Sequence, residues 1–455
     1  VGHLRSAILG DVVARILEFA GYEVVRANYF GDIGLHVIKW LWNYMKYHAG
    51  ERPEKDITRW MGDLYAEATR RLEENPDLEK EVRAVYARWD RRDPQVVALW
   101  QETRQWSIEG FDELYKILDI RFDRLYSQSE AEKAGQEIVQ ELIEQGIAID
   151  ERPAGPVIVR LDEILGLKKE KYRVVVILRS DGTALYSTED LALARMKFRE
   201  YNLCRSIYIV DVRQSLHFQQ VFKTLEIAGY PWADRCYHLP YEVVALPGNV
   251  VMSSREGTVV LLEDLIREAI QRALQVVEEK NPDLDEADKQ EVARAVGLGA
   301  LKYPMLARDS TKVVTFDWKS ALDFNGQAAP YIQYAHVRAN SILRKLQAEG
   351  VKAGSASELE PASFYYPLDP AEVQLIDLIS RFPSEVQRAA QEYRPLHITN
   401  LAYEIAKAFN DFYNQCPVLK AQPEVRASRL RLVAAARQAM ANSLALLGII
   451  APEVM

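Results

Sequence analysis

The sequence predicts an α/β domain that is interrupted by a mainly helical insertion and followed by an all-helical region. Strand-like apolar runs at residues 23–29, 172–178 and 205–210 are each followed by a helix-forming stretch, as in a largely parallel sheet. Between the first two runs, residues 36–142 are highly charged and repeat their apolar side chains at helical intervals. From residue 261 onward the pattern stays helical. The near-continuous β-branched run at 172–178 predicts a strand that is buried on both faces.

Composition excludes several classes of protein. At 455 residues the chain is too long for a single core, and its 48% hydrophobic and 27% charged content is that of a globular protein. We find neither an apolar run long enough to span a membrane nor a signal-peptide pattern. Cys204, Cys236 and Cys416 lie far apart, which argues against a disulfide framework and a metal site. We expect a reduced, cytoplasmic protein, and the net charge of −9 means that any nucleic-acid surface is a local basic patch.

The first residues, Val1, Gly2 and His3, form a short turn that leads directly into a stripe of apolar side chains beginning with Leu4 and Ile8. The four-residue spacing of this stripe fits one face of a helix. A helix start presents free N–H groups and a positive dipole end, which favour phosphate. A turn followed by a surface histidine is the commoner origin of such a pattern. Because a parallel sheet needs a strand before this helix, we expect a fragment that has lost its true N-terminus.

Polar side chains follow the strand-like runs, at the edge where open α/β sheets bind ligands. Asp32 lies in a glycine-spaced loop after the first run, and turn formation is its local alternative. Tyr186 and Asp190 lie one helical turn apart, a spacing at which a phenol and a carboxylate can hold a guanidinium. Helix capping explains Asp190 almost equally well. Gln214 and His217 lie three residues apart at the next junction.

The helix that carries Tyr186 and Asp190 also has local signals at its start. Ser187 or Thr188 is expected to cap it, and Glu189 complements its dipole. Aromatic side chains in residues 36–142, Trp60 and Trp106 among them, recur at helical spacing. We interpret these aromatic side chains as packing between helices rather than as a stacking site for a ligand.

Two further stretches have the chemistry of phosphate and RNA binding. Met252, Ser253, Ser254 and Arg255 form a small, hydroxylated, basic loop that could wrap phosphates, or equally a surface turn. The last hundred residues interleave basic and aromatic side chains, which can follow a phosphate backbone and stack on unpaired bases. A solvated helix face is the alternative there. The residues are Lys420, Arg426, Arg429, Arg431 and Arg437 with Tyr393, His397, Phe409, Phe412 and Tyr413.

Taken in order, these motifs resemble the class I aminoacyl-tRNA synthetases and, within that class, the arginyl-tRNA synthetases. The resemblance covers nearly the whole chain. The matching motifs are the end of the His-Ile/Val-Gly-His signature at residues 1–3, the Gly/Asn-Asp-x-Gly element at 31–34, the Tyr-xxx-Asp pair at 186 and 190, the Gln-xx-His-Phe element at 214–218, the Lys-Met-Ser-Lys-Ser loop at 252–257, a helical hallmark at 330–338, and the C-terminal stretches at 409–419 and 448–453. The chain departs from the family pattern where it lacks the first signature histidine and the lysines of the loop, and where His36 replaces a frequent glutamine.

The resemblance implies a Rossmann-like nucleotide-binding catalytic domain whose first strand is missing, with a mainly helical insertion, followed by an all-α anticodon-binding helical bundle. The expected boundaries are residues 1–35 for the first part of the catalytic domain, 36–171 for the insertion, 172–262 for its second half, 263–325 for a helical stem-contact or linker region, and 326–455 for the bundle.

The implied activity is ATP-dependent ligation of L-arginine to tRNA(Arg) through an arginyl-adenylate, with Mg²⁺ and with bound tRNA needed before arginine is activated. The implied catalytic residues are His3, Arg255, Ser253 and Ser254. The implied ATP-binding residues are Gly2, His3, His217, Met252 and Ser253. The implied arginine-binding residues are Tyr186, Asp190, Gln214, Asp32 and Glu130. The implied tRNA-binding residues are Tyr331, Gln333, Tyr334, His336, Arg338, Tyr413 and Arg429.

A monomer that binds no membrane is expected. Two alternatives stay open. One is another class I synthetase, such as the cysteinyl type. That type needs a zinc site, and this sequence offers no suitable Cys/His cluster. The other is a tRNA-binding protein without catalysis, because the chain contains only half of the signature and the fragment itself could be inactive.

Overall fold

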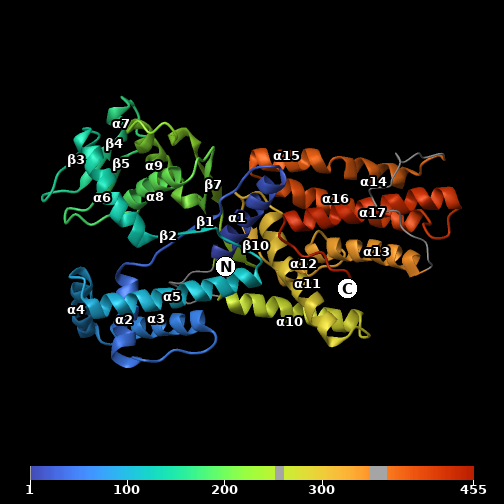
Figure 1. The fold of residues 1–455 in the computed structure, drawn as a ribbon, viewed down its shortest axis with the longest axis horizontal. Helices are drawn as coiled ribbons and strands as arrows, with labels where there is room; N and C mark the ends of the chain where they lie inside the picture. The colour runs from blue at the N-terminus through green and yellow to red at the C-terminus, as the bar shows by residue number, and fades with distance from the viewer. Residues whose placement is uncertain (1, 249, 252–260, 349–365) are drawn as a thin grey trace. The chain divides into compact units, whose positions relative to one another are not determined.

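The computed structural model describes residues 2–248, 250–251, 261–348 and 366–455. The chain falls into two compact units, and most of the helices and strands of both are labelled in Figure 1. Unit 1 consists of Val1–Val24, Ile209–Val212 and Leu239–Met455. Unit 2 consists of Val25–Tyr208 and Arg213–His238. None of the described helices is both long enough and apolar enough to cross a membrane.

Unit 2 contains a two-stranded parallel sheet that the sequence revealed only in part. Strand β1 (Ala27–Phe30) pairs with β2 (Arg124–Ser127), and Tyr29 lies opposite Tyr126. The prediction of a helical pattern over residues 36–142 is wrong at β2. This strand has only four residues, too few to show a two-residue periodicity, and its partner lies about a hundred residues earlier in the chain.

A helical subdomain connects these two strands. Its core contains Trp40, Tyr44, Trp60 and Trp106, and the rings of Trp40 and Tyr44 stack with centroids 5.2 Å apart. The prediction that these aromatic side chains pack between helices is confirmed. The helices are α2 (Leu35–Tyr47), α3 (Ile57–Glu74), η1 (Pro76–Leu78), α4 (Glu79–Asp90) and α5 (Pro94–Ile117).

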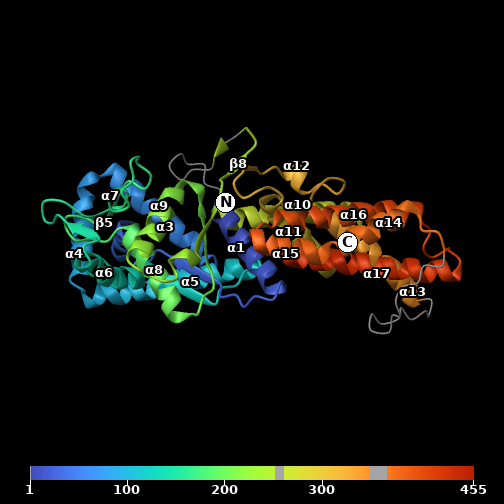
Figure 2. The ribbon, with the colours of Figure 1, turned by 90° about the horizontal axis from the view of Figure 1, so that it is seen from above.

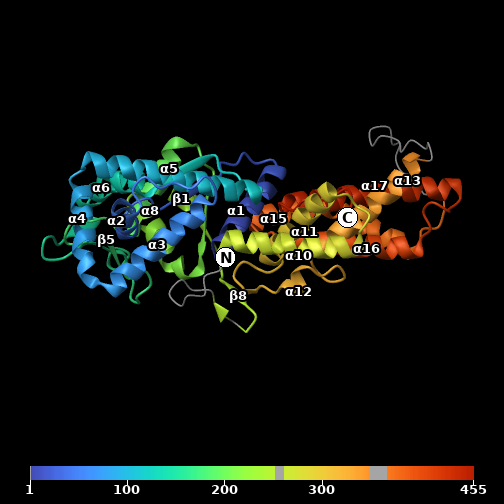
Figure 3. The same ribbon diagram turned by 90° about the horizontal axis from the view of Figure 1, so that it is seen from below.

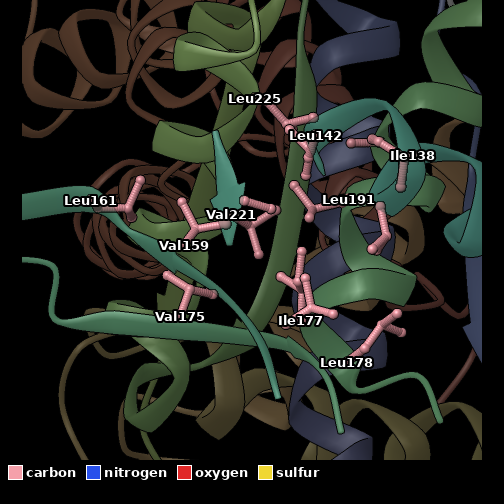
Figure 4. Close-up of a cluster of buried hydrophobic side chains, with 14 of the residues drawn as sticks. Ile138, Leu142, Val159, Leu161, Val175, Ile177, Leu178, Leu191, Val221 and Leu225 are labelled. Carbon is pink, nitrogen blue, oxygen red and sulfur yellow. The ribbon is translucent and has the colours of Figure 1, made fainter. Parts of the chain in front are cut away.

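The second core of unit 2 lies between a three-stranded antiparallel sheet and three helices. Figure 4 shows Val159, Val175 and Ile177 of the sheet pointing toward Leu191 and Val221 of the helices. The strands are β3 (Ala148–Asp150), β4 (Val157–Arg160) and β5 (Val174–Leu178), in the order β3-β4-β5. The helices are α6 (Gln128–Glu144), α8 (Tyr186–Glu200) and α9 (Ser215–Ile227), and the short α7 (Leu161–Ile164) follows β4.

Strands β3 and β4 thus form a small β element within residues 36–171, which the resemblance predicts to be mainly helical. The prediction of a parallel strand buried on both faces is wrong for β5, because this strand pairs antiparallel with β4 and its Val174 and Val176 are exposed. An antiparallel sheet can leave one face uncovered, and a run of β-branched residues does not distinguish the two cases.

Unit 1 is mainly helical. Its first helix, α1 (Gly2–Phe19), begins at Gly2, so Gly2 and His3 lie in the first turn of the helix and not in the turn expected there. Figures 2 and 3 show α13, α14, α16 and α17 running alongside one another, which agrees with the contacts between them. The remaining helices of unit 1 are α10 (Leu262–Lys280), α11 (Glu286–Leu306), α12 (Trp318–Ala321), α13 (Ala329–Ala348), α14 (Pro370–Ser380), α15 (Phe382–Glu392), α16 (Leu396–Gln415) and α17 (Pro423–Leu446).

A small sheet and a strand pair complete the architecture. Strand β8 (Val244–Leu246) pairs in parallel with β10 (Val314–Thr315) and antiparallel with β9 (Val250–Val251). Strand β6 (Ser206–Asp211) pairs with β7 (Cys236–Tyr241). The 3-10 turns η2 (Val212–Gln214) and η3 (Ala233–Arg235) lie between β6 and β7 in the chain.

Candidate functional site

The start of α8 is fixed to strand β5 by two hydroxyl groups. Ser187 Oγ donates to the carbonyl of Val176 at 2.6 Å, and Thr188 Oγ1 donates to the carbonyl of Ile177. The expectation that one of them caps the helix is wrong, because the N-cap position is Leu185 and no side chain caps it. The two hydroxyl groups instead hold the first turn of α8 in a defined orientation on the sheet.

Tyr186 and Asp190 project from this fixed first turn. Asp190 Oδ2 lies 2.6 Å from His217 Nε2, with His217 contributed by α9. With the proton placed on Nε2, His217 donates to the carboxylate and sets its orientation. The Asp190 side chain is 16% exposed, whereas Tyr186 is 72% exposed. The structure therefore joins a residue predicted to bind arginine to one predicted to bind ATP, and the exposed Tyr186 lies one helical turn earlier on α8.

Gln214 lies at the entrance to α9, three residues before His217. It is the last residue of η2 and the N-cap of α9, and its side chain is exposed. It therefore belongs to the same strand-to-helix junction as His217, as the sequence predicted.

Asp32 occupies a different kind of environment. Its Oδ2 accepts hydrogen bonds from Arg104 Nε at 2.8 Å and from Ser129 Oγ at 2.7 Å, and its Oδ1 accepts from the Ser129 N–H at 2.9 Å. Its backbone carbonyl accepts from Trp100 Nε1 at 2.6 Å. The side chain is only 2% exposed. Asp32 thus ties the loop after β1 to α5 and to the start of α6.

Glu189 is a buried acid that sequence reasoning did not place in the site. Its Oε2 accepts from the Tyr29 hydroxyl and its Oε1 from Gln128 Nε2, both at 2.8 Å. Burial raises the pKa of Glu189, and the hydrogen bonds from Gln128 and Tyr29 oppose that rise. Burial likewise raises the pKa of Tyr29. In the sequence, Glu189 is recognisable only as an acid adjacent to Asp190. We interpreted it as complementing the helix dipole, so nothing pointed to a place in the site.

Glu130 makes an ion pair with a neighbour on its own strand-to-helix segment. Its carboxylate lies 2.7 Å from Arg124 Nη2, and Arg124 also pairs with Glu200 at 3.2 Å. The Tyr126 hydroxyl donates to Glu200 as well. Glu130 therefore belongs to a network on β2, and its carboxylate already has a cationic partner.

Several predicted phosphate-binding residues cannot be located. Met252, Ser253, Ser254 and Arg255 lie outside the described residues, as does the side chain of His3. For Gly2 and His3 the structure describes the helical backbone of the first turn of α1. Among the residues that the structure describes, no group of three or more His, Cys, Asp or Glu side chains is arranged to hold a metal ion.

Some residues expected to bind tRNA are internal. Gln333 and His336 on α13 are buried and bind the C-terminal segment: Gln333 Nε2 donates to the carbonyl of Ile450 at 2.8 Å, and His336 Nδ1 lies 3.1 Å from the carbonyl of Pro452. Arg429 pairs with the fully buried Glu372 at 2.8 Å. The structure does not support direct RNA contact for these three residues, because their polar groups are used inside the fold.

The remaining residues of that set lie together at the surface. The Arg338 guanidinium lies 4.9 Å from the ring centroid of Tyr334 and 4.8 Å from that of Tyr413. Arg338 also donates to Asn410 Oδ1 at 2.6 Å. Tyr334 is 40% and Tyr413 is 43% exposed. Tyr331 packs against Tyr403 with ring centroids 5.4 Å apart. Tyr334, Arg338 and Tyr413, hereafter the Tyr-Arg-Tyr cluster, combine two exposed aromatic side chains with a partly buried cation.

Comparison with known proteins gives a consistent result. The model of the tRNA synthetases class I (R) catalytic domain matches residues 1–318, and that of the DALR anticodon binding domain matches residues 332–455. The arginine–tRNA ligase of Clostridium perfringens is 35% identical over the whole chain and 78% of its own length. That of Bdellovibrio bacteriovorus is also 35% identical, over 77% of its length.

Solved structures agree with these relatives. The arginyl-tRNA synthetase of Thermus thermophilus superimposes with a TM-score of 0.84 at 31% identity, covering the whole chain and 80% of that structure. The Plasmodium falciparum arginyl-tRNA synthetase shares the fold at 23% identity, with a TM-score of 0.77 and 74% of that structure covered.

Proposed function

The chain belongs to the arginyl-tRNA synthetase family, and on this premise we propose that Asp190, held by His217 and flanked by Tyr186, binds the guanidinium of arginine. The activity of the family is ligation of L-arginine to tRNA(Arg) with ATP as a substrate. The observation that supports the proposed site is the environment of Asp190. Within the described part of the chain its carboxylate has a single hydrogen-bond partner, and Tyr186, four residues earlier on α8, is 72% exposed.

The reaction proceeds in two steps. A carboxylate oxygen of arginine attacks the α-phosphorus of ATP, the bond from that phosphorus to the bridging oxygen breaks, and arginyl-adenylate and pyrophosphate form. A hydroxyl of the terminal adenosine of tRNA then attacks the carbonyl carbon of the adenylate, loses its proton and releases AMP. Such steps depend on positioning and charge stabilisation more than on a covalent nucleophile.

In this proposal the residues of unit 2 orient the amino acid. The Asp190 carboxylate offers charge and a planar acceptor to the guanidinium, and the hydrogen bond from His217 keeps the carboxylate from rotating. The Tyr186 hydroxyl adds a directional contact. A site of this kind discriminates against lysine, because an ammonium group cannot satisfy planar, forked acceptors in the same way.

The phosphate-binding roles remain proposals. They assign His3 and the backbone of Gly2 to the phosphates of ATP, and Ser253, Ser254 and Arg255 to the departing pyrophosphate. We propose that Mg²⁺ enters with ATP, bound to its phosphates as part of the substrate. The domain boundaries, the monomeric state and the cytoplasmic location likewise stay predictions.

Pyrophosphate exchange into ATP tests the activity. We expect exchange that depends on arginine and on tRNA(Arg). Exchange with a different amino acid would indicate another class I synthetase. Binding of tRNA without exchange under any condition would indicate a tRNA-binding protein without catalysis and would refute the proposal.

The Tyr-Arg-Tyr cluster is proposed as the tRNA-contacting part of α13 and α16. Stacking of a base on an aromatic side chain contributes about 1–3 kcal/mol, so Tyr413→Ala should weaken tRNA binding by roughly 5- to 150-fold in a filter-binding assay. Tyr65 on α3 is equally exposed, at 43%, and Tyr65→Ala is the matched control. Equal affinities of the two variants for tRNA would remove the cluster from the RNA surface.

A further inference from the structure

Arg5 attaches the first turn of α1 to two distant segments of unit 1. It is only 1% exposed, and its guanidinium donates to three backbone carbonyls: those of Lys312 at 2.9 Å, Asp309 at 3.2 Å and Glu242. The two segments also bind each other, since the Glu242 N–H donates to the Ser310 carbonyl at 2.8 Å. The position of the residues that follow Gly2 and His3 is therefore set by the loop at 309–312.

Asp309 connects this loop to the C-terminal bundle. Its carbonyl accepts from Arg5, while its carboxylate accepts from Arg394 Nε at 2.9 Å and from Arg394 Nη2. The other carboxylate oxygen closes the loop by accepting from the Thr311 N–H at 3.0 Å and its hydroxyl at 2.7 Å. A single residue thus receives a hydrogen bond from the start of α1 on one side and from Arg394 on the other.

Arg394 itself lies at the corner between α15 and α16. Tyr393 has a φ of 52°, in the left-handed region, and ends α15. The Arg394 N–H donates to the Ala389 carbonyl at 2.9 Å. At the other end of α15, Phe382 meets Phe19 near the end of α1, with ring centroids 5.8 Å apart. Helix α15 is therefore connected to both ends of α1, directly at one end and through Asp309 at the other.

We propose that Arg394, which lies in the region matched by the anticodon-binding model, is a positioning residue for adenylate formation. Through Asp309 it holds the loop at 309–312, and through that loop it holds Arg5 and the first turn of α1. The inference rests on the proposed function, in which Gly2 and His3 at that turn meet the phosphates of ATP. A displacement of ~1 Å at reacting groups can cost up to about a hundredfold in rate.

A purely structural role for Arg394 would lower the unfolding midpoint of the protein without a specific loss of turnover. The Arg394 side chain is 45% exposed and that of Asp309 is 23% exposed, and ion pairs at such sites contribute little to global stability. Loss of the pair should therefore leave the unfolding midpoint nearly unchanged. If Arg394 acts by positioning, the effect instead appears locally at α1 and in the turnover number.

The test compares Arg394→Ala with Arg381→Ala in the full chain. Arg381 lies at the end of α14, is 54% exposed and, among the residues that the structure describes, pairs with Asp377 of the same helix end, so its loss removes the same charge. We expect Arg394→Ala to lower the kcat of arginine-dependent pyrophosphate exchange by about tenfold, with the KM for arginine and the affinity for tRNA within about twofold. Arg394→Lys, which can restore one ion contact, should recover part of the kcat.

Amide hydrogen exchange gives a second measurement that does not require catalysis. Peptides covering residues 2–9 and 309–313 should exchange faster in Arg394→Ala than in the wild type or in Arg381→Ala. Unchanged exchange in both peptides would overturn the proposal even if the wild type were inactive. Faster exchange with an unchanged kcat would also overturn it. An inactive wild type with the expected exchange pattern would count against the proposed function alone.

Discussion

Asp190 and Asp32 were both predicted to bind arginine, yet the surroundings of their carboxylates differ. Both follow a strand or begin a helix in unit 2, and both are largely buried, with side chains 16% and 2% exposed. Asp32 accepts three hydrogen bonds, one of them from the cationic Arg104. Among the described residues Asp190 accepts one, from His217. The first carboxylate is occupied by the protein, and the second has capacity left for a ligand.

The difference follows from the acceptor capacity of a carboxylate. Its two oxygens offer about four lone-pair sites, and three of those of Asp32 are taken by groups from two other helices. A guanidinium could form a bidentate pair with Asp32 only by displacing Arg104 or Ser129. At Asp190 it could bind without breaking an existing contact. Free acceptor sites on the carboxylate, rather than its position in a motif, therefore distinguish a ligand-binding acid from one that stabilises the fold.

The largest expected effect is that of Asp190→Asn. The change keeps the shape of the side chain and removes its charge, so a guanidinium would lose its anionic partner. Loss of one partner of a close charge pair costs about 2–5 kcal/mol, and we expect the KM for arginine in pyrophosphate exchange to rise by about a hundredfold. The KM for ATP should stay within about threefold. Equal rises in both constants would remove Asp190 from the arginine site.

Asp32→Asn should give the opposite pattern. Removing one partner of a fully buried ion pair costs about 3–5 kcal/mol, but Arg104 is 30% exposed, so we expect about 1–3 kcal/mol less free energy of unfolding. Urea denaturation measures this loss. The KM for arginine should change less than threefold in the folded variant. A large rise in that KM with unchanged stability would make Asp32 a ligand-binding residue. The proposed contrast between Asp32 and Asp190 would then be wrong.

The sequence predicted those elements whose signals are local and periodic. The helices of residues 36–117 and 262–446 repeat apolar side chains every three to four residues, and their aromatic packing followed from the same spacing. Strand β2 has four residues and no such signal. Strand β5 has a strong strand signal, but β-branched residues do not report whether the second face is covered, so its exposed face was missed.

The candidate site was predictable only where both partners lie on one turn. Tyr186 and Asp190 are four residues apart and were found together. The Arg104 that occupies Asp32 lies 72 residues away in sequence, and the carbonyls that bind Arg5 lie more than 230 residues away. Which polar atoms are already bound depends on such long-range pairs, and a single sequence contains no information on them. For the same reason Gln333 and His336 could not be recognised as internal.

Tyr186→Phe tests whether the Tyr186 hydroxyl contributes to arginine binding at the proposed Asp190 site. The variant removes one hydroxyl, and a hydrogen bond of this kind contributes about 0.5–1.5 kcal/mol, so the KM for arginine should rise about two- to tenfold. Because Tyr186 is 72% exposed, the free energy of unfolding should not change measurably. Tyr29→Phe is the control, at a partly buried tyrosine whose hydroxyl donates to Glu189. If Tyr186→Phe leaves the KM for arginine unchanged, the phenol does not contact the substrate.

The smallest expected effect concerns Glu189, which lies next to Asp190 but is bound by Tyr29 and Gln128. Burial raises the pKa of Glu189 above its value in the unfolded chain. The folded state therefore favours the protonated acid, and this contribution to stability is fully present below the unfolded pKa and is lost as pH rises through the folded pKa.

Glu189→Gln removes that titration, since the amide stays neutral and still accepts from Tyr29. We expect the free energy of unfolding of the variant, relative to the wild type, to increase as the pH rises from about 4 to about 7. Chemical denaturation at several pH values measures the difference. Glu200→Gln is a suitable comparison, because hydrogen bonds from Arg124 and Tyr126 lower the pKa of Glu200 against the opposing effect of its burial. That variant should lose stability relative to the wild type as the pH rises. The same trend in both variants would mean that Glu189 is ionised in the folded protein and, like Asp32, acts as a charged structural residue.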